Sequence, residues 1–303
     1  MKTSVSRRDF LKAGSAALTL AAFTPQVFAA NEKTLTPKRP IKKGIMWGTV
    51  GFNGSIVEKM KAVKAAGFEG VEMMSHLNVE EVLKARDEAG LEIPSVCGEL
   101  HWKKPLTDPD PKIRAEGLEG LRQCLRDAKR YGASSVLLVP GVVNQEVSYA
   151  DAYQRAQAEI RKAVPLAEEL GVKIAIENVW NNFLLSPLEA ARFVDEFKSP
   201  AVGWHFDVGN VINSGWPEQW IQVLSQRIQK LHIKEFSRTK ADKEGKWAGF
   251  RVPLLEGENN WPAVMKALDD VGYRGWAITE QGGGDTLDGL KDLAARLEKI
   301  LAA

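Results

Sequence analysis

The chain has 303 residues, of which 44% are hydrophobic and 26% are charged, and its formal net charge is +2. These values are ordinary for a soluble globular protein, and the length is sufficient for one large domain. The small net charge argues against a partner that is held by its phosphate backbone, so we expect no nucleic-acid ligand.

The N-terminal segment has the pattern of a twin-arginine export signal. Residues 6–12 read Ser-Arg-Arg-Asp-Phe-Leu-Lys, and an apolar, alanine-rich run follows at 13–23. Small residues before Ala29 offer a cleavage site, so residues 1–29 are the predicted signal peptide. A buried amphipathic helix is the alternative, but it does not explain paired arginines beside a cleavage site. The apolar run is shorter than the roughly 20 residues that span a bilayer, so no stable membrane anchor is expected.

The predicted export signal implies a partner, the export machinery, and a location for the mature protein. Removal of residues 1–29 takes away four basic side chains and one acidic one, which changes the net charge from +2 to −1. The twin-arginine export machinery carries folded proteins and would suit an enzyme that acquires a metal before it crosses the membrane. A periplasmic or other extracytoplasmic location is therefore predicted. A short N-terminal extension, residues 30–42, would link the signal to the folded domain, residues 43–303.

From residue 43 onward, strand and helix patterns alternate without a break. The predicted strands are 44–50, 70–74, 93–99, 135–139, 173–179, 202–208, 230–236 and 276–281. The predicted helices are 55–66, 79–89, 110–131, 149–170, 186–197, 217–224, 261–271 and 285–301. Glycines follow several of these helices, where a left-handed residue commonly ends a helix.

Eight strands that alternate with eight helices predict the α/β class and a single-domain (β/α)8 TIM barrel. An open doubly wound sheet is the alternative, but no glycine-rich phosphate loop follows the first strand. The connection at 237–260 is long and rich in Lys, Glu and Gly. A connection of this length is typical of a functional lid or wall.

Four side chains with metal-ligand chemistry lie late in four successive predicted strands. They are Glu177, Asp207, His232 and Glu280. Active sites of TIM barrels lie at the carboxyl ends of the strands, so neighbouring strands would bring the four together. Three carboxylates and one imidazole suit a divalent ion; manganese is the expected one, and cobalt, magnesium or zinc would also fit.

Other polar or aromatic residues lie at predicted strand ends and are candidates for substrate contact. They are Trp47, His76, Glu99, His101 and Lys234. Glu72 is a further polar residue of the second predicted strand, to which no role is assigned. His205 is two residues before Asp207 on the same strand face, and we expect it to pack beneath the site.

The segments that carry the four candidates resemble a known superfamily. They are Ile-Glu-Asn at 176–178, Phe-Asp-Val-Gly-Asn at 206–210, Leu-His-Ile-Lys-Glu at 231–235 and Thr-Glu at 279–280. The chain resembles the sugar isomerase and epimerase superfamily with the xylose isomerase-like barrel, which includes tagatose and psicose 3-epimerases, hydroxypyruvate isomerase and inosose dehydratase.

This resemblance implies that the four residues bind one divalent metal ion and that Glu177 and Glu280 also exchange protons with a sugar. It further implies a substrate contact for Arg238, six residues after His232. Asn210 stands where the ketose 3-epimerases have a histidine, so it can only hydrogen-bond to substrate. Sugar-phosphate isomerases work in the cytoplasm, and the export signal therefore favours a non-phosphorylated sugar or sugar derivative.

The leading hypothesis is a metal-dependent isomerase or epimerase that removes a proton next to a carbonyl and forms an enediolate. If a leaving group lies β to the carbonyl, the same intermediate expels it, and the enzyme is a lyase that cleaves 3-keto-glycosides. A non-catalytic carbohydrate-binding barrel is a third possibility, and the fold is also compatible with a homo-oligomer. The apurinic endonuclease branch of this fold uses three zinc ions and many histidines, whereas this chain has four histidines.

Overall fold

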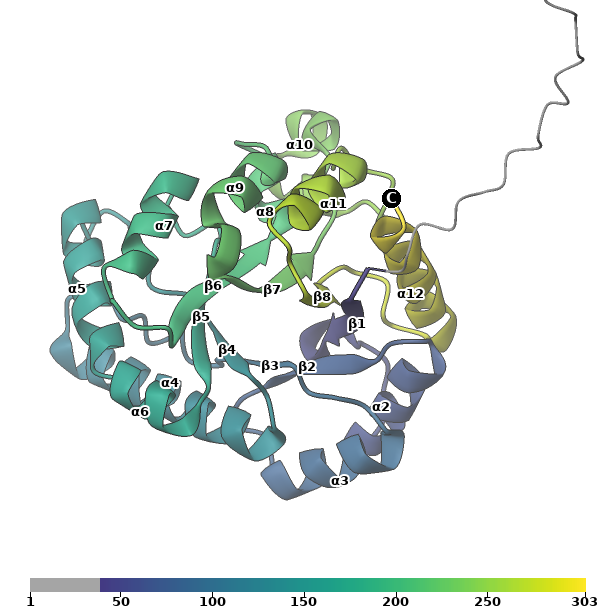
Figure 1. Ribbon diagram of the computed structural model, residues 1–303, viewed down its shortest axis with the longest axis horizontal. Coiled ribbons are helices and arrows are strands. Elements are labelled where there is room, and N and C mark those ends of the chain that lie inside the picture. The colour runs from purple at the N-terminus through teal and green to yellow at the C-terminus, as the bar shows by residue number, and fades with distance from the viewer. Residues whose placement is uncertain (1–38) are drawn as a thin grey trace, which may run out of the picture. The chain divides into compact units, whose positions relative to one another are not determined.

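The computed structural model describes residues 39–303. The predicted signal peptide and most of the predicted extension lie outside the described residues. Within 39–303, parallel strands form a closed barrel in chain order, and the first strand pairs with the last (Figure 1). The strands are β1 (Ile41–Met46), β2 (Gly70–Met74), β3 (Ser95–Cys97), β4 (Ser135–Leu138), β5 (Lys173–Glu177), β6 (Val202–Asp207), β7 (Ile228–Ile233) and β8 (Gly275–Thr279). The predicted TIM barrel is confirmed.

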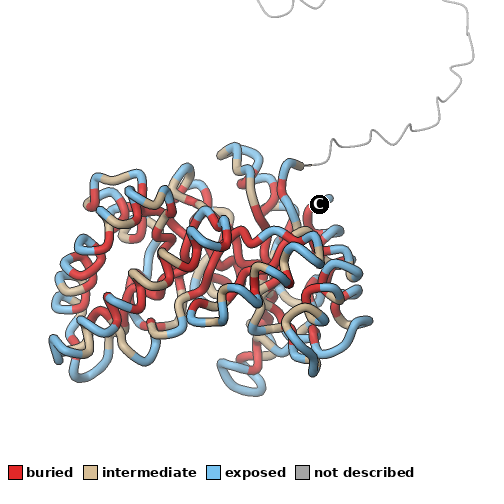
Figure 2. Tube along the Cα trace, turned by 90° about the horizontal axis from the view of Figure 1, so that it is seen from below, coloured by how far each residue is buried: buried red, intermediate tan, exposed pale blue. Residues whose placement is uncertain are grey.

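Helices surround the barrel and bury their apolar faces against the strands (Figures 1 and 2). The α-helices are α2 (Ile56–Ala65), α3 (Val79–Ala89), α4 (Pro111–Tyr131), α5 (Tyr149–Arg161), α6 (Val164–Leu170), α7 (Pro187–Asp195), α8 (Val208–Ile212), α9 (Pro217–Leu224), α10 (Arg238–Glu244), α11 (Trp261–Asp270) and α12 (Leu287–Leu301). Short 3₁₀ helices are η1 (Trp47–Thr49), η2 (Ser225–Arg227) and η3 (Lys246–Phe250). In the described part of the chain, none of the helices combines the length and apolar character needed to cross a membrane.

Prolines explain two differences from the predicted elements. The single helix predicted at 149–170 is two helices, α5 and α6, because Pro165 lacks an N–H and is accommodated only in the first turn of a new helix. The third strand begins at Ser95 and not at 93, because Pro94 cannot donate to the strand ladder, and it ends at Cys97. At the other end of the domain, β1 begins at Ile41, two residues before the predicted start of the barrel.

Alternation along β6 separates the hydrophobic core from a polar barrel interior. Trp204 and Phe206 are fully buried in the apolar core. His205 and Asp207, which point to the opposite face, are also fully buried but lie among charged side chains. The barrel interior therefore carries the polar groups of the candidate site.

The long connection after β7 folds into α10 and η3 and is fixed to the barrel by Glu235. The Glu235 carboxylate accepts hydrogen bonds from the N–H groups of Leu255 (2.7 Å) and Asn259 (3.1 Å) and from Trp261 Nε1 (2.9 Å). Gln281 Nε2 donates to the carbonyls of two further residues in this connection. Because these contacts are short and partly buried, the connection forms a fixed wall beside the carboxyl ends of the strands.

Candidate metal and substrate site

The four predicted ligands meet at the carboxyl ends of β5 to β8. Glu177 and Asp207 end their strands, His232 lies near the end of β7, and Glu280 directly follows β8. One potential ligand atom from each residue lies within 4.8 Å of the others. Asp207 and His232 are almost completely buried, whereas Glu280 is partly exposed. The barrel thus gathers three carboxylates and one imidazole in a space that a single ion could fill.

Lys234 shares this space with the four residues. Its Nζ lies 3.0 Å from Asp207 Oδ2 and 2.6 Å from Glu280 Oε2. His232 Nδ1 lies 2.9 Å from Glu177 Oε1 and 3.2 Å from Glu280 Oε2. The three carboxylates are therefore only partly balanced by one ammonium group and one imidazole of the protein itself.

Among the protein groups alone, the two glutamates have opposite pKa shifts. Burial raises the pKa of Glu177 to about 7, and the contact with His232 acts against this rise. Burial would also raise the pKa of Glu280, but attraction to Lys234 and His232 outweighs it and holds that pKa well below its usual range. Burial raises the pKa of Asp207, with Lys234 acting against it. The dense negative charge of the centre would favour a bound cation.

Asn178 and Asn210 hold Asp207 in place. The Asn178 amide donates to the Asp207 carbonyl (2.8 Å) and accepts from the Asp207 N–H (3.0 Å). The Asn210 N–H donates to Asp207 Oδ1 (2.8 Å), and the Asn210 amide donates to the Asn178 carbonyl (3.0 Å). Gly209 permits this turn to approach β7, because an added Cβ would lie 2.6 Å from the Lys234 carbonyl oxygen. Asn178 directly follows Glu177, but its contacts with Asp207 were not predicted from the sequence.

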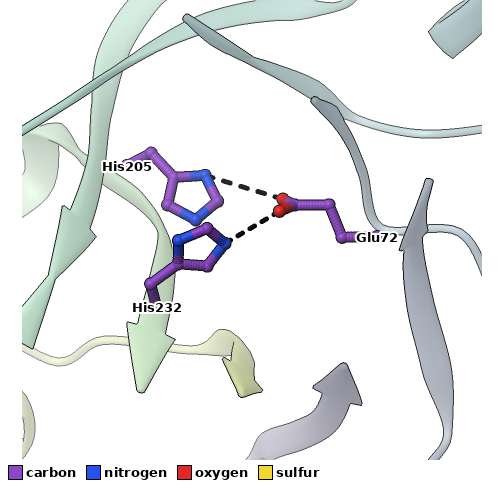
Figure 3. A group of neighbouring side chains, drawn as sticks. All are labelled: Glu72, His205 and His232. Carbon is purple, nitrogen blue, oxygen red and sulfur yellow. Dashed lines mark hydrogen bonds and ion pairs between the residues drawn. The ribbon is translucent and has the colours of Figure 1, made fainter. Parts of the chain in front are cut away.

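A second buried group lies on the inner side of His232 (Figure 3). Glu72, on β2 across the barrel, places Oε1 2.8 Å from His232 Nε2. Its other oxygen lies 3.8 Å from His205 Nδ1. The rings of His205 and His232 have centroids 4.2 Å apart. His205 thus lies beneath the centre as expected, whereas the contact of Glu72 with His232 was not predicted.

A cavity of about 490 Å³ opens above the centre. Its lining includes four of the predicted substrate-binding residues: Glu99, His101, Asn210 and Lys234. Aromatic side chains from several connections also line it, namely Trp102, Trp180, Trp247 and Phe250. The volume is typical of pockets for small-molecule ligands.

His101 is a neutral hydrogen-bonding residue of this cavity. The Val139 N–H donates to its Nδ1 at 3.3 Å, which leaves the proton of the neutral ring on Nε2. Burial lowers the pKa of His101 to about 4. At neutral pH the ring therefore has one fixed donor, Nε2–H, that a sugar hydroxyl or carbonyl could accept.

The other three predicted contacts, Trp47, His76 and Arg238, are not among the residues that line the cavity. Arg238 donates to the carbonyls of Ile212 (2.6 Å) and Gly215 (2.8 Å). Its guanidinium group is thereby held at the end of α8 and in the loop that follows, and the substrate contact that the resemblance implied stays a prediction. The His76 ring contacts the Ser75 hydroxyl (2.6 Å) and approaches Glu99, while Trp47 lies under the ammonium group of Lys59.

The fold and site define a sugar epimerase-like TIM barrel protein. The model of the xylose isomerase-like TIM barrel family matches residues 60–300, and the chain belongs to this family. The L-ribulose-5-phosphate 3-epimerase UlaE of Escherichia coli strain K12 is 25% identical over 240 residues, which cover 74% of this chain and 81% of UlaE.

Solved structures show the same fold. The 3-keto-D-glucoside 4-epimerase YcjR from E. coli matches with a TM-score of 0.74 and 19% identity, covering 86% of this chain and 99% of YcjR. An L-ribulose 3-epimerase matches with a TM-score of 0.73 and 18% identity, covering 86% of this chain and 94% of that one.

Proposed function

We propose that this protein is a divalent-metal-dependent enzyme that removes a proton next to a carbonyl of a non-phosphorylated sugar or sugar derivative. The observation that carries the proposal is the convergence of Glu177, Asp207, His232 and Glu280 within 4.8 Å. The donor set fits the ion, because carboxylate oxygens and an imidazole nitrogen are ligands of divalent cations, and the buried atoms Asp207 Oδ2 and Glu280 Oε2 already converge on a cationic group, the ammonium of Lys234. When bound there, a divalent ion would stabilise the negative charge that develops on the substrate oxygens.

Glu177 and Glu280 are the proposed proton carriers. They extend from β5 and β8, so a substrate carbon between them would have a carboxylate on each side. One carboxylate removes the proton, and the other, in its acid form, returns one to the opposite face. This exchange inverts the configuration at that carbon; return of the proton to the neighbouring carbon would instead give an isomer.

The lining of the cavity favours a substrate without phosphate. Of the described residues that line it, only Lys234 is a lysine or arginine, and its ammonium group already contacts two carboxylates. A phosphate dianion placed here would meet three carboxylates with no free cationic partner among those lining residues. A neutral sugar, by contrast, could donate hydroxyl hydrogen bonds to the same carboxylates.

An aromatic wall favours a second candidate, a lyase that cleaves 3-keto-glycosides. Lys234 Nζ lies 5.3 Å from the centroid of the Phe250 ring, Phe250 lies 4.8 Å from Trp180, and Trp180 lies 4.8 Å from Trp247. Trp247 is 68% exposed, so the wall extends from the centre to the solvent. A group attached to the sugar could pack along these rings.

The chemistry of the second candidate differs only after proton removal. Loss of the C2 proton of a 3-keto-glycoside forms a C1=C2 double bond as the C1–O bond breaks. The released aglycone then takes a proton from the glutamic acid. In the epimerase or isomerase, C1–O stays intact and carbon regains the proton.

Solvent exchange tests the proposal and separates the candidates. Manganese-loaded protein in deuterated water would be incubated with free ketoses and with aryl 3-keto-glycosides. We expect deuterium at the carbon next to the carbonyl, lost in Glu177→Gln and Glu280→Gln, and aglycone release if the lyase is correct. Sugar binding without exchange or cleavage of any substrate would instead identify a non-catalytic carbohydrate-binding barrel.

The location is also a proposal. The paired arginines at positions 7 and 8, the apolar run at 13–23 and the small residues before Ala29 support export through the twin-arginine machinery to the periplasm. A periplasmic enzyme would meet glycosides more readily than sugar phosphates, in agreement with the cavity lining.

A further inference from the structure

The His232 ring is in contact with carboxylates through both of its nitrogens, and Figure 3 shows the contact with Glu72. Nδ1 faces Glu177 and Glu280 at the strand ends, at 2.9 Å and 3.2 Å. Nε2 lies 2.8 Å from Glu72 Oε1, on the opposite side of the barrel. His232 and Glu72 are both buried, so solvent does not compete for either contact.

We propose that Glu72 is the positioning residue of the metal centre: it accepts the proton of His232 Nε2 and thereby presents Nδ1 to the ion. A neutral imidazole carries one N–H, and only the other nitrogen can bind a metal. Glu72 lies outside the strand-end set, so its carboxylate can accept the proton of Nε2 while Nδ1, which faces Glu177 and Glu280, is free for the ion. This inference rests on the proposed metal site.

The side chains around Glu72 also hold the His232 ring in its orientation. His205 packs against His232 with ring centroids 4.2 Å apart and an angle of 67° between the planes. Its Nδ1 lies 3.8 Å from Glu72 Oε2. Since all three side chains are buried, the imidazole has little room to turn. Removal of a carboxylate that accepts a hydrogen bond from a metal-bound histidine typically weakens metal affinity by about 10- to 100-fold.

A second ion held by Glu72, His205 and His232 is the competing interpretation, since their ligand atoms also lie within 4.8 Å of one another. That ion would need an unprotonated Nε2 on His232, whereas the ion at the strand ends needs an unprotonated Nδ1. A neutral ring cannot supply both. The strand-end set offers three carboxylates against one, so it is the stronger site for a dication.

Metal affinity of three variants tests the role of Glu72. Full-length protein would be stripped of metal and titrated with Mn²⁺ by calorimetry. We expect Glu72→Met to weaken binding by about 10- to 100-fold and Glu72→Gln, whose amide oxygen still accepts, to lie between it and wild type. Asp127→Asn is the matched control, because Asp127 is equally buried but contacts His76 and Gln123, away from the centre. Its affinity should equal that of wild type.

Nitrogen NMR of wild-type protein tests the tautomer directly. The chain has only four histidines, so ¹⁵N-labelled imidazoles in the Zn²⁺-loaded protein can be assigned by substitution. We expect His232 to show a protonated Nε2 and a metal-bound Nδ1. This measurement keeps the proposal testable even if Glu72→Met does not fold.

The outcomes distinguish the two proposals. If wild type binds no ion, both the metal site and the role of Glu72 are overturned. If wild type binds one ion but Glu72→Met binds it equally well, or if Nε2 is the metal-bound nitrogen, only the role of Glu72 fails. Two ions per chain, with the second lost in His205→Ala, would establish the competing site instead.

Discussion

Substitution of Lys234 by methionine should strengthen metal binding while weakening the metal-free protein. The Lys234 ammonium group lies 3.0 Å from Asp207 Oδ2 and 2.6 Å from Glu280 Oε2, two of the proposed ligand atoms. An ion that binds these oxygens must first displace the ammonium group. Methionine keeps the length of the side chain but removes the charge, so the ion no longer competes with it.

The size of the effect follows from the burial of the two ion pairs. Exposed pairs contribute about 1 kcal/mol or less, whereas breaking a fully buried pair costs about 3–5 kcal/mol. The Lys234 side chain is 17% exposed, which lies between these limits. We therefore take about 2 kcal/mol for the displacement, which corresponds to roughly 30-fold tighter binding of Mn²⁺ in Lys234→Met. Without metal, the same loss should lower the melting temperature by about 4–8 °C.

Calorimetric titration with Mn²⁺ and thermal unfolding in a chelator measure these two quantities. Lys230→Met is the matched control, because Lys230 is a buried lysine four residues earlier, on β7, and its Nζ instead contacts Ser134 Oγ at 2.8 Å. Its metal affinity should match wild type. Unchanged or weaker Mn²⁺ binding in Lys234→Met would refute the inference that the ammonium group and the ion compete for the same carboxylates.

Three further predictions concern the cavity and the N-terminus. The pKa of His101 is about 4 in the folded protein and about 6.5 in the unfolded chain. The unfolded chain therefore binds more protons between these values, and the free energy of unfolding falls as the pH drops through this range. From pH 7 to pH 5 the loss is about 2 kcal/mol. Urea unfolding should show a loss in wild type that exceeds the loss in His101→Gln by about this amount, and equal losses in the two proteins would contradict the prediction. Trp247→Ala should leave the melting temperature nearly unchanged, because the side chain is 68% exposed. It should weaken the binding of aryl glycosides by about fivefold and leave the binding of methyl glycosides unchanged. Replacement of Arg7 and Arg8 by lysine should leave the full-length precursor in the cytoplasm on fractionation, and normal export would argue against the twin-arginine route.

The sequence was sufficient to predict the barrel and the four residues of the centre. Strand and helix periodicities alternate clearly, and each candidate ligand lies late in its strand, where parallel strands of a barrel bring side chains together. Neither inference needs knowledge of side-chain direction. The same alternation places Lys234 on the face of His232, but its contact with Asp207 and Glu280 depends on distances that periodicity does not give.

Residues whose roles depend on packing across the barrel or on loop conformation could not be predicted in the same way. Glu72 lies mid-strand in β2, and its contact with His232 depends on the stagger of strands on opposite sides of the barrel. Arg238 has the expected spacing from His232, but the loop carbonyls of Ile212 and Gly215 hold its guanidinium group. Sequence spacing identifies a position, whereas the local hydrogen-bond acceptors decide where a long side chain points.

The most direct test of the central claim is the number of ions bound at the strand ends. Metal-free wild-type protein titrated with Mn²⁺ by calorimetry should bind one ion per chain. Asp207→Ala, which removes a ligand that has no proposed part in proton transfer, should abolish that binding while the protein remains folded. Absence of Mn²⁺ binding in wild type, or equal binding in folded Asp207→Ala, would contradict a metal centre formed by Glu177, Asp207, His232 and Glu280.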